Sequence, residues 1–527
     1  MKRVWENTGL VLMMLLLWLP VLQREFRLFP ESSLEGDFSR PPRPLFSAEQ
    51  WFSGEFQQKC EPWLGQESGF YPLLVRLNNQ YNFSLFRHTD ADGVVTGRNL
   101  MMYEYDYIRE LTGRDYLGYR LIDRRMRRLR FLQNFLKQQY GIDLILIFEP
   151  GKASVYPDYL PPRYRKLLPA DSTNYDTYKM VADRYGVRYL DWDAWFRNLR
   201  YKSPFPVYPR YGTHWSTWGA TLATDSLIRV VNQIRDLDIG RVVIDSVNQS
   251  TQPNTPDSDI GNTMNLLFRL PAKDTMGYPH FHFEKGPDAG KPNVLVVGDS
   301  YYWNIFNTRM PGEFFENETF WYFNHFVYPE TYYDTTLTDD LDLQKEIEKR
   351  DVIFLSVTRR FLYKFDWGFI NRLWNLYGLS SGLNRYDEYL AGIVSDDNWF
   401  RDVLTKAKIN GRTIGTQMML DAGYMFYVKH PVEFLTLMGP EPWLWKYGYS
   451  QVSQKAIPDE VFETALTQFK NERPEEFAGY FQYRAAKDSV RLNPDNQDRI
   501  RRLAEEYFLS EEEVIAILAE KEIMSDL

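Results

Sequence analysis

Short apolar runs alternate with longer stretches of helical periodicity through the middle of the chain. The apolar runs predict strands at residues 144–148, 187–190, 241–244, 294–297 and 352–357. The stretches between them predict helices at residues 175–185, 216–235 and 340–349. Short apolar strands separated by helices are typical of a parallel sheet that helices cover on both faces. The pattern therefore predicts an α/β fold, in which ligands bind at the carboxyl ends of the strands.

The first 29 residues carry the pattern of a membrane-targeting segment. Lys2 and Arg3 precede an apolar run at residues 10–22. At ~1.5 Å per residue this run covers about 20 Å, short of a ~30 Å hydrocarbon core unless its flanks join in. Since no small-residue cleavage site follows, we favour an uncleaved signal-anchor over residues 1–29, with a cleaved signal peptide as the alternative. The anchor would pass once through the inner membrane, and either alternative places the bulk of the protein in the periplasm or otherwise outside the cytoplasm.

The rest of the chain divides by composition into three parts. Residues 30–65 are rich in proline, serine and charge, which predicts an extended stalk. Residues 66–390 carry the α/β pattern, and the polar stretch 249–290 within them is expected to be an insertion or edge segment near the site. Residues 391–527 show amphipathic periodicity and predict a C-terminal helical region.

Charge and cysteine content exclude several classes of function. The net charge of −9 and a pI near 5.5 argue against nucleic-acid binding, which needs a basic surface. The single cysteine, Cys60, leaves no internal disulfide and no cysteine-based zinc site. His280 and His282 alternate as on one face of a strand, but no acidic or cysteine cluster accompanies them. We therefore predict no metal site.

Ser300 has the sequence surroundings of a nucleophile. It follows the apolar run 294–297 and the turn pair Gly298-Asp299, and a helix is expected to begin just after it. Free backbone N–H groups of a first helical turn suit a developing oxyanion. His214, one of only six histidines, lies 86 residues upstream between Thr213 and a tryptophan. Each feature alone is also typical of an ordinary turn or a packed histidine, whereas together they favour acyl chemistry with His214 as general base.

Four motifs together resemble those of a known family. These are Gly-Asp-Ser at 298–300, His-Trp-Ser-Thr-Trp-Gly at 214–219, Pro-Gly-Lys to Leu-Pro at 150–161, and the strand at 350–358. The combination resembles the SGNH hydrolase-like proteins of the AlgJ/AlgX (DHHW) group over roughly residues 65 to 425. The resemblance implies an extracytoplasmic enzyme that moves acetyl groups on or off polysaccharide hydroxyls. It also implies a membrane-bound O-acyltransferase partner as acetyl donor.

One departure from the family's pattern concerns the triad acid. The family has an aspartate two residues before the histidine, and this chain has Gly212 there. Loss of the carboxylate that orients a catalytic histidine costs orders of magnitude in rate. Asp191 and Asp193 are the nearest acids in sequence, although helix N-capping is the commoner role for such positions. Another acid, a Ser-His dyad, or binding without catalysis are the alternatives.

Several further residues are candidates for the same site. The backbone N–H of Tyr301 and the side-chain amide of Asn324 are candidate oxyanion donors, and His325 is an alternative base. Three cations are candidates for holding an anionic sugar or an acyl oxygen: Lys152, Arg359 and Arg360. Ion pairing with the many acidic residues is the simpler role for these cations.

The sequence thus favours an O-acetyltransferase or acetylesterase that acts on a cell-surface or exported polysaccharide. Such a Ser-His mechanism requires neither a metal nor a diffusible cofactor. The alternative is a non-catalytic protein that binds or helps to assemble a glycan, and Gly212 is the feature that favours it. The sequence does not separate a transferase from an esterase, because the two differ only in whether a sugar hydroxyl or water reaches the acyl-enzyme.

Overall fold

A six-stranded mixed sheet forms the centre of the molecule in the computed structural model. The structure describes residues 13–14, 17–36, 41–89, 91, 93–287, 290–379, 383–430 and 459–525. The sheet has the strand order β4-β3-β10-β7-β8-β9. Its strands are β3 (Asp143–Glu149), β4 (Tyr189–Asp191), β7 (Val294–Gly298), β8 (Thr319–Tyr322), β9 (Phe326–Tyr328) and β10 (Val352–Thr358). All neighbouring pairs are parallel except β8 and β9, so the α/β prediction is confirmed with one antiparallel edge strand.

Strands β3, β7 and β10 are buried on both faces, which explains their continuous apolar sequences. Leu146, Leu355 and Val297 are register partners across these three strands, and all are fully buried. Alternate residues point to opposite faces of the sheet, as the two-residue period of a strand requires. Leu355 packs in the core on one face, whereas its neighbour Phe354 packs in the core on the other.

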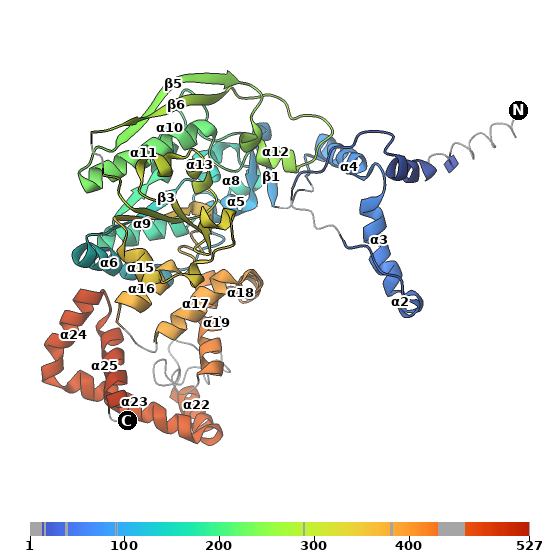
Figure 1. The fold of residues 1–527 in the computed structure, drawn as a ribbon. Coiled ribbons are helices and arrows are strands. Elements are labelled where there is room, and N and C mark those ends of the chain that lie inside the picture. The colour runs from blue at the N-terminus through green and yellow to red at the C-terminus, as the bar shows by residue number, and fades with distance from the viewer. Residues whose placement is uncertain are drawn as a thin grey trace, which may run out of the picture.

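Helices cover both faces, as predicted. The first face packs against α6 (Tyr119–Tyr140), α9 (Asn174–Tyr185) and α16 (Phe369–Tyr377). The second face packs against α10 (Trp192–Leu199), α11 (Thr217–Arg235) and α13 (Tyr302–Phe306). Shorter helices lie in the connections: α5 (Tyr105–Leu111), α7 (Lys152–Val155), α8 (Pro162–Arg165), α12 (Asp259–Thr263), α14 (Met310–Phe314) and α15 (Leu343–Glu348). Figure 1 shows the layers.

One predicted strand has a different place from the one expected, and a further apolar stretch is divided by a turn. The strand at 241–244 is part of β5 (Gly240–Ser250), which pairs only with β6 (Met276–Lys285) in a separate antiparallel hairpin. Most of β5 is exposed or half-buried, so its few apolar residues do not enter the central sheet. The chain at 321–327 is not one strand, because Phe323 and Asn324 take left-handed backbone conformations and turn β8 back into β9.

The N-terminal part contains helices where an extended stalk was expected. These are α2 (Ala48–Ser53) and α3 (Glu55–Glu67), whose tip projects from the body in Figure 1, and α4 (Tyr71–Phe86) follows beyond the expected stalk. The Ser47 side chain begins α2 by accepting a hydrogen bond from the Gln50 N–H. In the described part of the chain no helix has the length and apolar character needed to cross a bilayer. Residues 1–12, 15 and 16 of the expected anchor lie outside the described residues.

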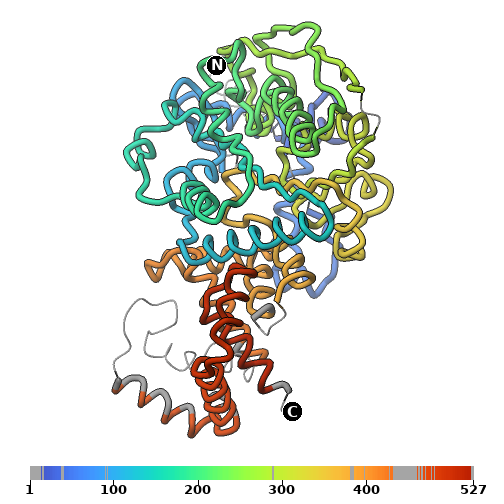
Figure 2. The backbone as a smooth tube through the Cα atoms, turned by 90° about the vertical axis from the view of Figure 1, so that its left-hand side faces the viewer, coloured from blue at the N-terminus to red at the C-terminus, as the bar shows by residue number. Residues whose placement is uncertain are grey.

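The C-terminal part is helical wherever the structure describes it. The helices are α17 (Leu383–Ser395), α18 (Asp397–Ile409), α19 (Ile414–Lys429), α22 (Asp459–Glu472), α23 (Pro474–Leu492), α24 (Pro494–Tyr507) and α25 (Glu511–Ser525). Figure 2 shows them gathered at one end of the α/β body. Arg127 of α6 lies 3.0 Å from the Glu513 carboxylate, and Phe131 of α6 stacks on Tyr507. Two small strands, β1 (Val94–Thr96) and β2 (Met102–Glu104), pair with each other in an antiparallel sheet and precede α5 in the chain.

Candidate active site

Ser300 lies directly after β7, at the carboxyl edge of the sheet. A Cβ at Gly298 would lie 3.0 Å from the Ser356 carbonyl oxygen, so glycine allows β7 to lie close to β10. The buried Asp299 carboxylate accepts hydrogen bonds from the backbone N–H groups of Tyr301 (3.0 Å) and Thr358 (2.9 Å). These two bonds fix the turn. They leave the Ser300 hydroxyl half-buried at the edge of the sheet, as the sequence pattern predicts.

Aromatic packing and a helix cap hold His214 in place. Trp215 is buried between the rings of Phe196 and Tyr301, at 5.6 and 5.2 Å. The Ser216 side chain begins α11 by accepting a hydrogen bond from the Gly219 N–H (3.1 Å). The His-Trp-Ser motif therefore anchors the backbone at the two residues that directly follow His214. The His214 side chain itself stays half-buried.

The structure brings three side chains into one hydrogen-bonded chain. His214 Nε2 lies 2.9 Å from Ser300 Oγ, and His214 Nδ1 lies 3.1 Å from an oxygen of Asp259. A carboxylate only accepts hydrogen bonds, so Nδ1 carries the proton and Nε2 is free to accept one from the serine. The predicted approach of His214 to Ser300 is confirmed. The acceptor on the second nitrogen is a carboxylate from elsewhere in the chain.

Asp259 supplies to His214 the carboxylate that Gly212 lacks. Its other oxygen accepts hydrogen bonds from the backbone N–H groups of Thr213 and Ile260, both at 2.7 Å. A Cβ at Gly212 would lie 3.1 Å from the Asp257 carbonyl group and 2.7 Å from Pro209 Cγ. The segment that carries Asp259 thus packs where a side chain at position 212 would lie. Sequence reasoning missed this residue, although it placed the segment 249–290 near the site.

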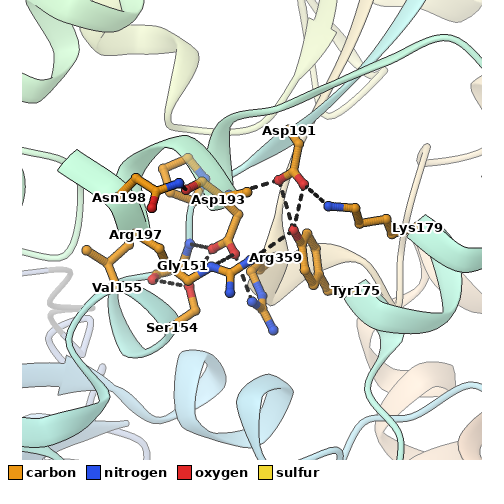
Figure 3. A network of polar contacts seen from close by, with 12 residues as sticks. Gly151, Ser154, Val155, Tyr175, Lys179, Asp191, Asp193, Arg197, Asn198 and Arg359 are labelled. Carbon is orange, nitrogen blue, oxygen red and sulfur yellow. Dashed lines mark hydrogen bonds and ion pairs between the residues drawn. The ribbon is translucent and has the colours of Figure 1, made fainter. Parts of the chain in front are cut away.

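Asp191 and Asp193 are not the triad acid. Asp191 begins α10 by accepting from the Ala194 N–H (2.9 Å), and its carboxylate lies 2.5 Å from Lys179 Nζ. Asp193 is fully buried and lies 3.0 Å from an Arg359 nitrogen. Figure 3 shows both aspartates within one polar network. Neither contacts His214, because both side chains are held at the ends of β4 and α7.

Arg359 and Lys152 are held inside the protein. Arg359 donates two hydrogen bonds of 2.9 Å to the buried Glu110 carboxylate. Lys152 Nζ donates to the carbonyl oxygens of Arg210 (3.1 Å) and Gly212 (2.5 Å). Burial lowers the pKa of Lys152 to about 7. In this structure Lys152 supports the backbone that leads into His214, and neither cation is exposed to a substrate.

Arg360 is the predicted cation that reaches Ser300. Its Nη2 lies 3.5 Å from Ser300 Oγ, and its guanidinium forms an ion pair with Glu104. The guanidinium also lies over the Tyr107 ring, with 5.0 Å to the centroid. Burial lowers the pKa of Arg360 to about 10, so it remains protonated at neutral pH. A fixed positive charge therefore stands beside the serine hydroxyl.

The two oxyanion donors expected from the sequence are occupied. The Tyr301 N–H donates to Asp299, and the Asn324 side-chain amide donates to the Trp367 carbonyl oxygen (3.0 Å). Asn324 is directed there because it lies in the tight turn between β8 and β9. The backbone N–H of Ser300 itself has no acceptor among the described residues. Arg360 and the Ser300 N–H are thus the donors nearest the nucleophile.

The remaining histidines lie outside the site. His325 is exposed and packs beside the Phe326 ring, so the base position beside Ser300 belongs to His214. His280 and His282 are on β6, where they contact Asn248 and Asp245. In the described ranges no group of three or more His, Cys, Asp or Glu side chains is arranged to hold a metal ion.

An open cleft of about 950 Å³ leads to the Ser-His-Asp chain. His214 and Asp259 line the cleft together with Glu104, Tyr105 and Asp106. The N-terminal part supplies further lining residues: Glu35, Gly36, Val75 and Asn79. Asn79 donates a 2.9 Å hydrogen bond to the Met264 carbonyl oxygen, which fixes α4 beside the segment that carries Asp259.

Comparison with known proteins identifies the domain that carries this site. Residues 118–308 match the family described as "SGNH hydrolase-like domain, acetyltransferase AlgX". This stretch contains all three residues of the hydrogen-bonded chain. This match confirms the resemblance to the SGNH hydrolase-like AlgJ/AlgX group that the sequence shows. No curated protein matches the sequence.

Three solved structures are similar to part of this chain. The O-acetyltransferase domain of Pseudomonas putida AlgJ is 22% identical and is matched over 54% of this chain and 99% of its own, with a TM-score of 0.36. Pseudomonas aeruginosa AlgX is 16% identical over 50% of this chain and 55% of its own, with a TM-score of 0.31. Bacillus cereus PatB1 with a sulfonyl adduct is 12% identical over 48% and 95%, also with a TM-score of 0.31.

Proposed function

We propose that this protein is an O-acetyltransferase or acetylesterase that acts on a cell-surface or exported polysaccharide through an acyl-enzyme at Ser300. The observation that carries the proposal is the chain from Ser300 through His214 to Asp259. A serine that donates to an imidazole, which in turn donates to a carboxylate, is the arrangement that activates a hydroxyl for acyl transfer. The family match, described as an acetyltransferase, supports the same chemistry.

The reaction takes two steps that share one intermediate. Ser300 Oγ attacks the acetyl carbonyl of the donor while His214 Nε2 takes the hydroxyl proton. The donor's leaving group departs with that proton, and the acetyl group remains as an ester on Ser300. A sugar hydroxyl, or water, then loses its proton to His214 and attacks this ester. The Ser300 oxygen leaves with the proton from His214, so the enzyme returns to its starting state.

Each tetrahedral intermediate carries a negative oxygen that needs donors. We assign this role to the Arg360 guanidinium and the Ser300 N–H, because the Tyr301 and Asn324 donors are bound elsewhere. A preorganised donor of this kind contributes roughly 10²–10³ in rate. Asp259 stabilises the imidazolium that forms in each step.

The cellular setting is part of the proposal. The apolar run at residues 10–22 supports an extracytoplasmic protein that is attached to the inner membrane by its N-terminus. Such a position would allow a membrane-bound O-acyltransferase to hand over the acetyl group. Transfer to a sugar requires that the acceptor hydroxyl outcompete water at Ser300, and the open cleft at His214 provides room for it.

A trapping experiment tests the proposal. The full-length protein is incubated with 4-nitrophenyl acetate, quenched in acid and examined by intact-mass and peptide mass spectrometry. We expect one acetyl group on the peptide that contains Ser300, and none in Ser300→Ala. Ser489→Ala, which removes an exposed serine of α23, should behave as the wild-type protein does. If the wild-type protein and Ser300→Ala acetylate alike, the non-catalytic glycan-binding function is the better account.

A further inference from the structure

The cleft beside the Ser-His-Asp chain is lined by carboxylates. Four acidic side chains face it: Glu35, Glu104, Asp106 and Asp259. The side chains of Glu104, Asp106 and Asp259 are 33%, 41% and 33% exposed, and Glu35 is exposed. Among the described residues that line this cleft there is no lysine or arginine.

The cations that pair with these carboxylates lie behind them. Arg360, the partner of Glu104, is only 9% exposed, and Arg109, which lies 3.3 Å from Asp106, is 17% exposed. Asp259 is paired with His214, a group that must be neutral to act as a base. A molecule in the cleft therefore meets the negative partner of each pair first. Both guanidiniums are held in these ion pairs, and neither arginine is among the residues that line the cleft.

The acidic lining comes from three separate parts of the chain. Glu104 and Asp106 belong to β2 and α5, Asp259 begins α12, and Glu35 comes from the N-terminal part. The Glu35 N–H donates a 2.8 Å hydrogen bond to the Asn265 side chain, which fixes this segment beside the segment of Asp259. A neighbouring depression contains Arg76 and Arg269, but it does not include His214.

From this arrangement we infer that the sugar units that enter the cleft beside Ser300 carry no negative charge. They are neutral or amine-bearing sugars, and polyuronates are excluded by like-charge repulsion. The inference rests on the proposed function, since it names the acceptor of that same site. Placing like charges together is a common way to reject a wrong substrate. Repulsion between charges a few ångströms apart at a protein surface corresponds to about a tenfold or larger effect on binding or rate.

The experiment compares acceptors of matched length with the full-length protein. Cello-oligosaccharides are neutral, chitosan oligosaccharides carry amines, and oligogalacturonates carry carboxylates. Transfer of acetyl from 4-nitrophenyl acetate is measured for each as kcat/KM by mass spectrometry. Binding of the same oligosaccharides to Ser300→Ala is measured separately by calorimetry, which reports on the cleft without any chemistry. Asp106→Asn and Glu104→Gln reduce the negative charge, and Asp498→Asn, on the remote helix α24, is the matched control.

We expect the neutral or the amine-bearing acceptors to exceed oligogalacturonate at least about tenfold in kcat/KM. The ratio should shrink about threefold or more in Asp106→Asn and Glu104→Gln, with no change in Asp498→Asn. Equal or better use of oligogalacturonate, or a ratio that the first two variants leave unchanged, overturns the inference. If no acetyl group is found on Ser300, the proposed function is overturned instead. The binding measurement still tests the inference in that case, because preferential binding of oligogalacturonate to Ser300→Ala overturns it.

Discussion

Asp193 and Asp259 are two aspartates near the carboxyl edge of the sheet, and their surroundings are opposite. Asp193 is fully buried, and its oxygens lie within 3.0 Å of nitrogens of Arg359 and Arg197. Asp259 is one-third exposed, and its partners are two backbone N–H groups and the His214 imidazole. The first carboxylate is neutralised by cations that hold the fold together. Among the described residues the second forms an ion pair only with His214, once the imidazole takes a proton.

The comparison separates a structural carboxylate from the one that we propose orients the general base. A buried carboxylate needs permanent ion-pair or hydrogen-bond partners, because desolvation of an unpaired charge is very costly. An acid that serves a general base needs a partner whose charge appears during the reaction. Figure 3 shows the structural network around Asp193 and Arg197, to which Tyr175 joins Asp191 and Lys179. The same residue type thus has two roles that local burial and pairing distinguish.

The sharpest test of the comparison is Asp259→Asn. An asparagine keeps the shape of the side chain but does not stabilise the imidazolium and can favour the wrong tautomer. We expect kcat for acetyl-ester hydrolysis to fall by about 10³–10⁴, while the melting temperature changes little. Asp498→Asn, the remote control, should leave kcat unchanged. A loss of less than about tenfold in Asp259→Asn would mean that a Ser-His dyad is sufficient.

The second test removes the structural carboxylate. Asp193→Asn leaves Arg359 with one carboxylate partner, Glu110, in a fully buried position. Breaking a buried ion pair from one side costs about 3–5 kcal/mol of unfolding free energy. Urea unfolding should show this loss, and the remaining folded protein should keep a near-normal kcat. The matched variant Asp191→Asn should cost clearly less, because its carboxylate is partly exposed to water. Equal losses would contradict the distinction between the two sites.

The same contrast explains what the sequence alone could predict. Ser300 and His214 belong to local patterns: an apolar strand with a Gly-Asp turn, and a tryptophan that anchors the start of a helix. Such patterns are readable because their causes lie within a few residues. Asp259 lies 45 residues after His214 in a polar segment without a motif. Its place depends on tertiary packing over Gly212, so no local pattern could point to it.

The fold, like the site, was predictable from the sequence where its cause is local and not where it depends on non-local pairing. The three central strands are continuous apolar runs because both of their faces are buried. The strand at 241–244 was assigned to the central sheet by its apolar character, but pairing with β6 is a non-local choice that the run does not encode. Asn324 was expected to be an oxyanion donor, and the tight turn that directs it to Trp367 was not visible in the strand pattern.

The next prediction concerns the residue that holds the segment of Asp259 in place. The Asp257 carboxylate accepts hydrogen bonds from the Thr217 N–H (3.1 Å) and hydroxyl (3.3 Å) at the start of α11. Burial raises its pKa to about 6, against the opposing effect of these bonds and of Tyr278. The folded protein therefore keeps this proton more tightly than the unfolded chain does. Its contribution to stability is present below the unfolded pKa of about 4 and is lost as the pH rises through about 6.

Asp257→Asn should remove this pH dependence. Relative to the wild-type protein, the variant's free energy of unfolding should improve by up to about 3 kcal/mol between pH 4 and pH 7.5. Urea unfolding at several pH values measures the difference. For Asp498→Asn, an exposed position, the difference from the wild-type protein in free energy of unfolding should not change with pH over the same range. If the difference in free energy of unfolding between Asp257→Asn and the wild-type protein also does not change with pH, the fold does not raise the pKa of Asp257.

The smallest expected effect tests whether the loop of His214 needs its buried support. Lys152 Nζ donates to the carbonyl oxygens of Arg210 and Gly212, just before His214. Lys152→Met removes both donors, so the loop gains freedom and the imidazole spends less time aligned with Ser300. We expect kcat to fall about tenfold with little change in KM, since misalignment weakens the transition state more than substrate binding. Lys152→Gln, which keeps an N–H donor, should recover part of the rate. If Lys152→Met instead raises KM and leaves kcat unchanged, Lys152 acts on the substrate and not on the loop.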